Sequence, residues 1–184
     1  MTLIRHRIKS AVTAFVVLLA TPAVAQNTEL DPLFDALQQA QGPAAQEIEQ
    51  KIWQEWSKSG SPAMDLLLQR GRDAMDEGNF RLAIEHFTAL IDHAPEFAEG
   101  YNARATAYFQ DGKYGPSLAD IRETLRRNPR HFGALGGLGL ILEELGEVDG
   151  ALEAQRAVRA LYPNREGLEE TIRRLERQAE GQEI

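Results

Sequence analysis

The sequence contains no cysteine among its 184 residues. Disulfide bonds, thiolate metal ligands and cysteine nucleophiles are therefore excluded, and no thiol is available to carry a lipid. Histidine is scarce as well, because the chain has only four, His6, His86, His93 and His131. Their spacing matches no HExxH-type motif, so we expect no metal site and no cofactor.

The sequence also lacks the arrangements that catalysis requires. It contains no G-x-S-x-G motif and no general base with an orienting partner. The run from Gly136 to Gly139 does not form a phosphate loop, because Leu142 takes the place of the last glycine of GxGxxG and no strand is expected before it. We therefore expect no catalytic residues. Gly136 and Gly137 stay unexplained within a helix, which indicates close approach by another group or local flexibility.

Net positive charge is missing too. The chain has 20 lysines and arginines against 28 aspartates and glutamates, which gives a formal net charge of −8. Nucleic acids and anionic lipid surfaces bind cationic proteins, because cationic groups must replace the released counterions. We therefore expect no nucleic-acid partner and no attachment to a membrane surface.

An apolar run, Ala11–Ala20, stands between a basic stretch at residues 5–9 and the small-residue sequence Ala23-Val24-Ala25. This order is typical of a secretory signal peptide. An uncleaved membrane anchor is the alternative, but the run is shorter than the about 20 residues that span a bilayer. We expect residues 1–25 to be removed after Ala25. The remaining protein would be exported, in a Gram-negative bacterium to the periplasm, without membrane insertion.

A 34-residue period organises the rest of the chain. Four sequence columns keep that step over three copies: Gly71, Ala105 and Gly139; Gly78, Gly112 and Gly146; Ala83, Ser117 and Ala151; Pro95, Pro129 and Pro163. In each copy, apolar residues at helical spacing end at a glycine, and a second apolar stripe ends before a proline. The period therefore predicts three consecutive helical hairpins.

This pattern resembles the tetratricopeptide repeat (TPR) family, whose copies carry a bulky residue at position 4, small residues at positions 8 and 20 and proline at position 32. With copies at residues 64–97, 98–131 and 132–165, position 4 holds Leu67, Tyr101 and Leu135. The sequence departs from the family at position 7, with Arg70 and Arg104, and at position 24, with Gln155. The resemblance implies an all-α, right-handed α-solenoid whose hairpins stack to bury a common core.

Helical segments flank the repeats. Residues 26–63 hold two predicted helices, which we interpret as an N-terminal cap in the place of a degenerate fourth repeat, because Trp53 and Trp56 lie 34 residues before Phe87 and Leu90. The spacing of the tryptophans favours core packing over an exposed hot spot. Residues 166–184 carry a one-sided apolar stripe, which predicts a C-terminal capping helix, with a partner-binding helix as the alternative.

The resemblance also implies that the first helix of each hairpin lines a concave groove. Positions 2, 5, 9 and 12 of these helices give the candidate partner-binding residues, which are Asp65, Leu68, Arg72, Met75, Glu99, Asn102, Thr106, Phe109, Gly136, Leu140 and Glu143. Some family members hold a C-terminal carboxylate in this groove with Lys, Asn and Arg side chains. The corresponding positions here are Leu68, Arg72, Ala103, Gly133 and Gly137, of which four lack the needed donor, so that clamp is not expected.

These features predict a non-enzymatic protein-interaction module, an adaptor or scaffold in the periplasm that binds a polypeptide segment in its groove. Leu68, Met75, Phe109 and Leu140 would contact apolar side chains of the partner, and Arg72 is the one obvious cation. Two other interpretations stay open. One is a self-assembling structural protein of the cell envelope, and the other is a hydrolase whose catalytic residues are not recognisable from the sequence.

Overall fold

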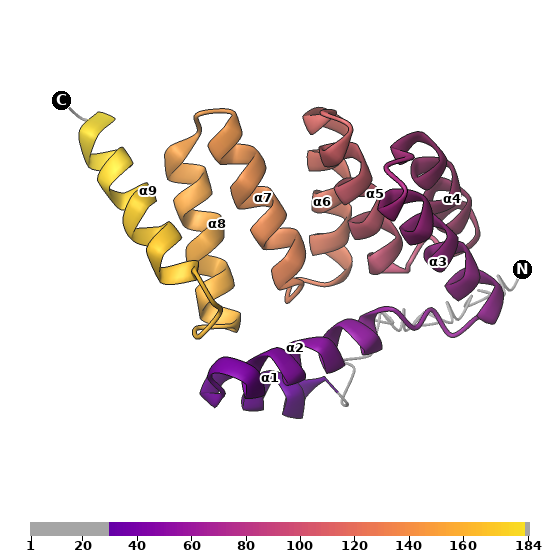
Figure 1. The fold of residues 1–184 in the computed structure, drawn as a ribbon, viewed down its shortest axis with the longest axis horizontal. Coiled ribbons are helices and arrows are strands. Elements are labelled where there is room, and N and C mark those ends of the chain that lie inside the picture. Colours follow the sequence, from indigo (N-terminus) through magenta and orange to yellow (C-terminus); the bar gives the residue numbers. More distant parts are fainter. Residues whose placement is uncertain (1–29, 183–184) are drawn as a thin grey trace, which may run out of the picture.

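The computed structural model describes residues 30–182, and all regular elements in this range are helices (Figure 1). In chain order they are α1 Asp31–Gln39, α2 Gly42–Trp56, α3 Pro62–Asp76, α4 Phe80–His93, α5 Ala98–Gln110, α6 Tyr114–Arg127, α7 Phe132–Glu144, α8 Val148–Leu161 and α9 Leu168–Gln182. The predicted signal peptide, residues 1–25, lies outside the described residues. Within residues 30–182, no helix is both long and apolar enough to cross a membrane.

The hairpins α3–α4, α5–α6 and α7–α8 stack one after another along the chain, as the 34-residue period predicts (Figure 1). Each first helix ends at a glycine with positive φ, and the values are +72° at Gly78, +71° at Gly112 and +77° at Gly146. Glycine suits this left-handed conformation because it has no Cβ to clash with the backbone. The predicted all-α TPR fold is therefore confirmed.

Small residues let the two helices of a hairpin pack closely. A Cβ built on Gly71 would lie 2.2 Å from the Phe87 ring, so only glycine fits between α3 and α4 as they stand. In the next hairpin, the Ser117 hydroxyl donates a hydrogen bond to the carbonyl of Ala105 at 2.7 Å. These columns of the repeat are thus conserved in size within the chain because they mark helix crossings.

Helix α9 covers the free side of the last hairpin, as the sequence analysis expects of a capping helix (Figure 1). Its apolar stripe is buried, with Leu168, Ile172 and Leu175 each less than 5% exposed. The burial of this stripe removes apolar surface from water at the end of the stack. Ion pairs Arg156–Glu176 and Arg174–Glu143 join the same helix to α8 and α7.

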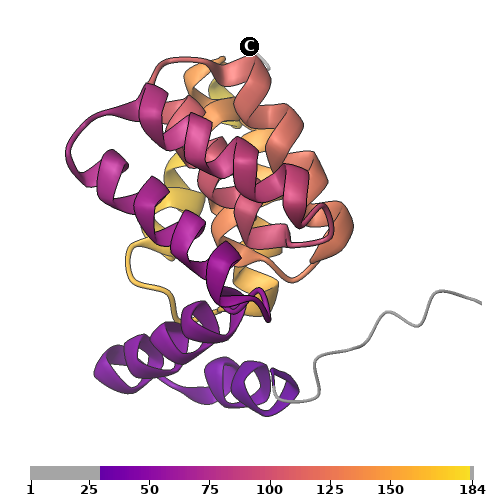
Figure 2. The same ribbon diagram turned by 90° about the vertical axis from the view of Figure 1, so that its right-hand side faces the viewer.

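The N-terminal pair α1–α2 does not stack upstream of α3, and the prediction of an upstream cap is wrong in its placement. The pair crosses beneath the ends of the last hairpin, as the two views agree (Figures 1 and 2). Trp56 stacks on His131, with ring centroids 4.2 Å apart. Gln38 donates a hydrogen bond to the carbonyl of Ala160 at 2.8 Å, and Asn164 donates one to the carbonyl of Ala40 at 2.9 Å.

The tryptophans explain why the pair lies there. Trp53 and Trp56 both contact Phe132 at the start of α7, with centroid distances of 5.7 and 4.9 Å. Phe34 of α1 joins them 6.3 Å from the Phe132 ring. Trp56 is buried, so its predicted role in core packing is confirmed, but its partners His131 and Phe132 lie at the junction of the second and third repeats and not in the first. Hereafter, α1–α2 is called the N-terminal arm.

Candidate binding groove

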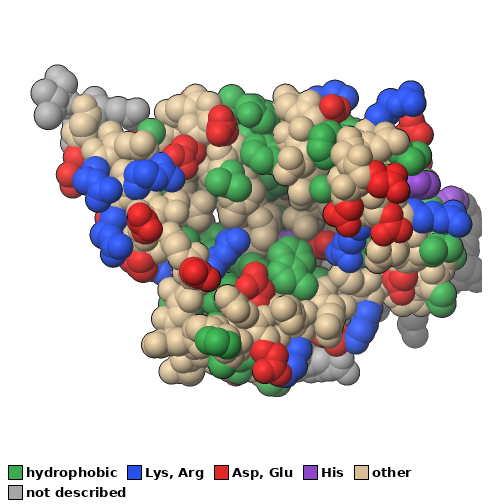
Figure 3. Space-filling model, viewed as in Figure 1, with side chains coloured by type: hydrophobic (Ala, Val, Ile, Leu, Met, Phe, Trp, Pro, Cys, Tyr) green, Lys and Arg blue, Asp and Glu red, His purple; other side chains and the backbone are tan. Residues whose placement is uncertain are grey.

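A cavity of about 440 Å³ lies between α5, α7 and α9, on the side formed by the first helices of the second and third hairpins. The space-filling view shows this face hollowed between α9 and the middle of the stack (Figure 3). Its apolar lining includes Phe109, Ile121, Leu140 and Ile141, and its polar lining includes Asn102, Thr106, Gln155 and Thr171. The mixed lining suits a ligand that presents both apolar and polar groups.

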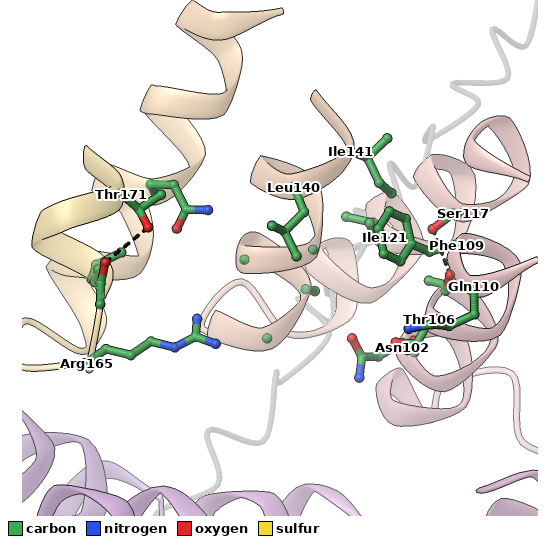
Figure 4. A pocket seen from close by; sticks show the side chains of 18 of the residues that line it. Asn102, Thr106, Phe109, Gln110, Ser117, Ile121, Leu140, Ile141, Arg165 and Thr171 are labelled. Atoms are coloured by element: carbon green, nitrogen blue, oxygen red, sulfur yellow. Dashed lines mark hydrogen bonds between the residues drawn. The ribbon is translucent and has the colours of Figure 1, made fainter. Parts of the chain in front are cut away.

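Five of the eleven predicted groove residues line this cavity, namely Asn102, Thr106, Phe109, Gly136 and Leu140 (Figure 4). They come from α5 and α7, the helices that the repeat pattern assigned to the groove. Leu140 is 51% exposed although it is a large apolar residue, so its side chain is available for contact. That these five bind a partner stays a prediction.

The predicted residues of the first repeat do not reach the cavity. Leu68 is only 2% exposed and packs in the core between α3 and α5. Ala103 and Ala107 of α5 belong to the same core, whose members pack densely. Met75 packs against this core, and Asp65 accepts hydrogen bonds from the backbone N–H and the hydroxyl of Ser59.

Arg72, the one obvious cation predicted for the groove, is already paired within the fold. Its guanidinium donates hydrogen bonds to Glu99 at 2.7 Å and to the Ser57 hydroxyl at 3.0 Å. Glu99 is 3% exposed and also accepts a hydrogen bond from Asn102 at 3.2 Å. Because a buried carboxylate requires partners, this arginine serves the fold.

His131 completes the same network beneath the stack. Its Nδ1 accepts the backbone N–H of Ala134 at 3.0 Å, so in the neutral ring Nε2 carries the proton and donates to Glu99 at 3.1 Å. The ring is fully buried against Trp56. His131 therefore connects α7 to α5 and to the N-terminal arm, and it has a structural role.

The other predicted acid, Glu143, is paired as well. It accepts hydrogen bonds from both terminal nitrogens of Arg174 on α9. Arg174 lines the cavity, and this hydrogen bond raises the pKa of its guanidinium. The pair joins α7 to α9 across one end of the cavity and fixes the position of both walls.

The glycines of α7 have separate explanations. A Cβ at Gly133 would lie 2.5 Å from Trp53, and one at Gly139 would lie 2.5 Å from Gln155. At Gly136 it would lie 3.0 Å from the guanidinium of Arg165, which confirms the expected close approach by another group. At Gly137 the nearest atom is on Ile121 at 3.7 Å, an ordinary contact. Gly137 thus has room for a methyl group and contributes no side chain to the cavity that it lines.

Arg165, in the turn before α9, points into the cavity toward the glycine face of α7 (Figure 4). Within residues 30–182, its guanidinium has no hydrogen bond and no ion pair. Arg165 was not among the predicted groove residues, since all of these lie on the first helices of the hairpins. Arg165 is the last residue of the third copy, and its distance from those helices along the chain gave no signal of proximity.

Two further observations concern metal ligands and titratable groups. No group of three His, Cys, Asp or Glu side chains within residues 30–182 could hold a metal ion. The pKa of Tyr162 is raised to about 12 by burial, by the charge of Glu49 and by a hydrogen bond to that carboxylate. Tyr162 lies in the core beside Phe132 and is not part of the cavity lining.

Comparison with known proteins agrees with this architecture. The sequence matches the tetratricopeptide repeat family over residues 68–116 and 102–166. A TPR repeat-containing protein of Rhizobium etli is 37% identical over 135 residues, which cover 73% of this chain and 66% of that protein. This chain therefore spans just under two thirds of the length of that relative.

Solved TPR domains share the fold. The Sgt2 TPR domain of Aspergillus fumigatus is 24% identical, with a TM-score of 0.61 over 65% of this chain and 81% of that one. The first TPR domain of Spaghetti (RPAP3), bound to an HSP90 peptide, is 22% identical, with a TM-score of 0.61 over 63% of this chain and 92% of that one. Together with the repeat geometry, these matches establish that the chain belongs to the tetratricopeptide repeat family.

Proposed function

We propose that this protein is a non-enzymatic interaction module that binds a polypeptide segment in the groove between α5, α7 and α9. The observation that carries the proposal is the exposed apolar side chain of Leu140 in a cavity to which its neighbour Gly137 adds no side chain. A solvent-exposed leucine within a concave, partly apolar surface is a typical contact point for an apolar side chain of a ligand.

A structural relative supports a peptide as the ligand, since the TPR domain of Spaghetti is bound to the HSP90 peptide SRMEEVD. The ligand of the present protein would be held differently. Leu68, Ala103, Gly133 and Gly137 supply no side-chain donors, and Arg72 is engaged by Glu99. Apolar contacts and the residues of α5, α7 and the turn before α9 would determine recognition.

Two exposed leucines of the third repeat provide a matched test. Leu140 lies in the groove and Leu145 in the turn after α7, and both are 51% exposed. Leu140→Asp places a charge in the groove, whereas Leu145→Asp places the same charge outside it. Proteins recovered from an envelope extract with wild-type bait would be quantified by mass spectrometry and compared with those recovered by each variant.

We expect Leu145→Asp to recover the wild-type partner and Leu140→Asp to lose at least 90% of it, which corresponds to about 1.4 kcal/mol. Circular dichroism would check that both variants keep the wild-type helix content. Equal recovery by the two variants would refute binding in the groove.

We further propose that the protein acts in the periplasm, on the basis of the signal-peptide pattern of residues 1–25. N-terminal sequencing of the protein from an osmotic-shock fraction should then read Gln26 as the first residue. A chain that begins at Met1 and stays in the cytoplasmic fraction would contradict this part of the proposal.

A further inference from the structure

Arg72, Arg165 and Arg174 differ in their hydrogen-bond partners. Arg72 is bound by Glu99, and Arg174 is bound by Glu143. Arg165 has no such partner within residues 30–182, although its guanidinium lies within reach of the α7 backbone at Gly136. A guanidinium presents a planar set of donors that matches a carboxylate, so an unpaired one inside a cavity is a strong attractor for an acidic group.

Within the cavity, the cation and the apolar side chains lie at different places. Arg165 enters from the turn before α9, while Phe109 of α5 lies on the opposite side and Leu140 of α7 lies between them (Figure 4). Gly137 adds no side chain to the floor. A ligand that spans the cavity can thus place a carboxylate at one side and an apolar side chain at the other.

We infer that the groove selects a polypeptide segment in which an aspartate or glutamate side chain pairs with Arg165 and a nearby apolar side chain packs against Leu140 and Phe109. This inference rests on the proposed function and adds the chemistry of the ligand to it. Charge complementarity identifies the acidic residue, because Arg165 is the unpaired guanidinium among the described residues of the cavity lining. The carboxylate of the same lining, Glu166, accepts a hydrogen bond from Gln46 at 3.5 Å and makes no ion pair with Arg165 within residues 30–182.

The acidic group is assigned to a side chain and not to a chain terminus. The cavity is open to solvent along one face, so a bound chain can enter and leave it (Figure 3). The five positions at which family members hold a terminal carboxylate do not include Arg165, and four of them here carry Leu68, Ala103, Gly133 and Gly137. One guanidinium is sufficient to pair with a single side-chain carboxylate through two parallel hydrogen bonds.

A selection from random peptides tests the inference. The purified protein would be offered bead-displayed nonapeptides with acetylated N-termini and amidated C-termini, and in parallel the same peptides with free C-termini. Enriched sequences would be compared between wild type, Arg165→Gln, Arg165→Lys and Arg122→Gln. Arg122 is an exposed residue of α6 outside the cavity lining, so Arg122→Gln is the control for loss of one positive charge.

We expect wild type and Arg122→Gln to enrich aspartate or glutamate beside an apolar residue in the amidated library. Arg165→Gln should keep the apolar preference and lose the acidic one, and Arg165→Lys should keep part of the acidic preference. Replacing the selected acid by its amide should weaken binding about tenfold in wild type and leave binding to Arg165→Gln unchanged, because a charge-assisted hydrogen bond is removed only once.

The contrary outcomes are distinct. An acidic preference that persists in Arg165→Gln, or enrichment only among peptides with free C-termini, would overturn this inference while leaving groove binding intact. Enrichment of apolar peptides without any acid, abolished by Leu140→Asp, would do the same. Failure of the wild-type protein to enrich any peptide would overturn the proposed function and this inference together. Unchanged melting temperatures of the Arg165 variants would show that altered selection is not a result of misfolding.

Discussion

The first and third repeats share one sequence period but differ in what covers them. The third repeat is packed between α9 and the N-terminal arm, and its core includes Phe34, Trp56, Phe132 and Tyr162, all of them buried. The first repeat packs against α5, and Leu66 on its first helix is 50% exposed. The same repeat pattern is therefore compatible with very different surroundings, which are determined by the flanking helices.

This difference has a consequence for binding. The cavity lies at the covered end of the stack, where α9, α7 and the arm hold the walls in place. A groove with fixed walls loses less conformational entropy when a ligand binds. The arm and α9 thus stabilise the part of the solenoid in which a preformed site is most useful.

The largest effect is expected where the arm meets the third repeat. Trp56→Ala should lower the free energy of unfolding by about 3–5 kcal/mol, because it removes a buried ring stacked on His131. Leu66→Ala, in the first repeat, should change it by less than about 0.5 kcal/mol, since half of that side chain is already in water. Urea denaturation followed by circular dichroism would measure both. Similar losses in the two variants would show that the arm adds no special stability.

Substitutions of one glycine in the first repeat and one in the third should change stability by intermediate amounts and in opposite directions. Gly71→Ala in the first repeat should destabilise by about 1–3 kcal/mol, because the new methyl group would overlap the buried ring of Phe87. Gly137→Ala in the third repeat should stabilise by up to about 1 kcal/mol, since alanine favours the helix and meets only an ordinary contact with Ile121. Thermal melts of both variants would decide, and a loss of stability in Gly137→Ala would mean that the floor of the cavity is not free.

The smallest expected effect is a dependence of stability on pH that arises from Tyr162 in the core of the third repeat. The pKa of Tyr162 is about 12 in the folded protein, above the ordinary value of about 10 expected after unfolding. Between these values the folded protein retains a proton that the unfolded chain has lost. The contribution of Tyr162 to the free energy of unfolding is therefore fully present below pH 10 and decreases as the pH rises toward 12.

We expect wild type to lose about 1 kcal/mol more than Tyr162→Phe between pH 9 and pH 11. The phenylalanine variant serves as the reference because all other titrating groups remain. Parallel stability curves for the two proteins, from urea denaturation at each pH, would contradict the effect of burial at this site.

Much of the fold was predictable because repeat contacts are local. The glycine and proline columns mark the ends of helices, and the small-residue columns mark helix crossings, so the hairpins follow from the period alone. The apolar stripe of residues 168–179 likewise predicted α9. Each of these features depends on residues close together in the sequence or in the neighbouring repeat.

Long-range placement was not predictable in the same way. Helical spacing showed that Trp53 and Trp56 share an apolar face, but it could not show that this face meets His131 and Phe132. Arg72 was predicted as the cation of the groove because the sequence does not reveal that Glu99 would be buried beside it. Arg165 was missed because its role arises from the path of the turn before α9.

Photo-crosslinking locates a bound segment most directly. A peptide enriched in the selection, carrying one photoreactive side chain at its apolar position, would be irradiated with the purified protein, and the modified residues would be identified by mass spectrometry. We predict adducts on α5 near Phe109 and on α7 near Gly137 and Leu140, with competition by the unmodified peptide. Adducts confined to α4, to the exposed face of α3 or to residues of α6 and α8 outside the cavity lining would contradict the proposal that this protein binds its partner in the groove.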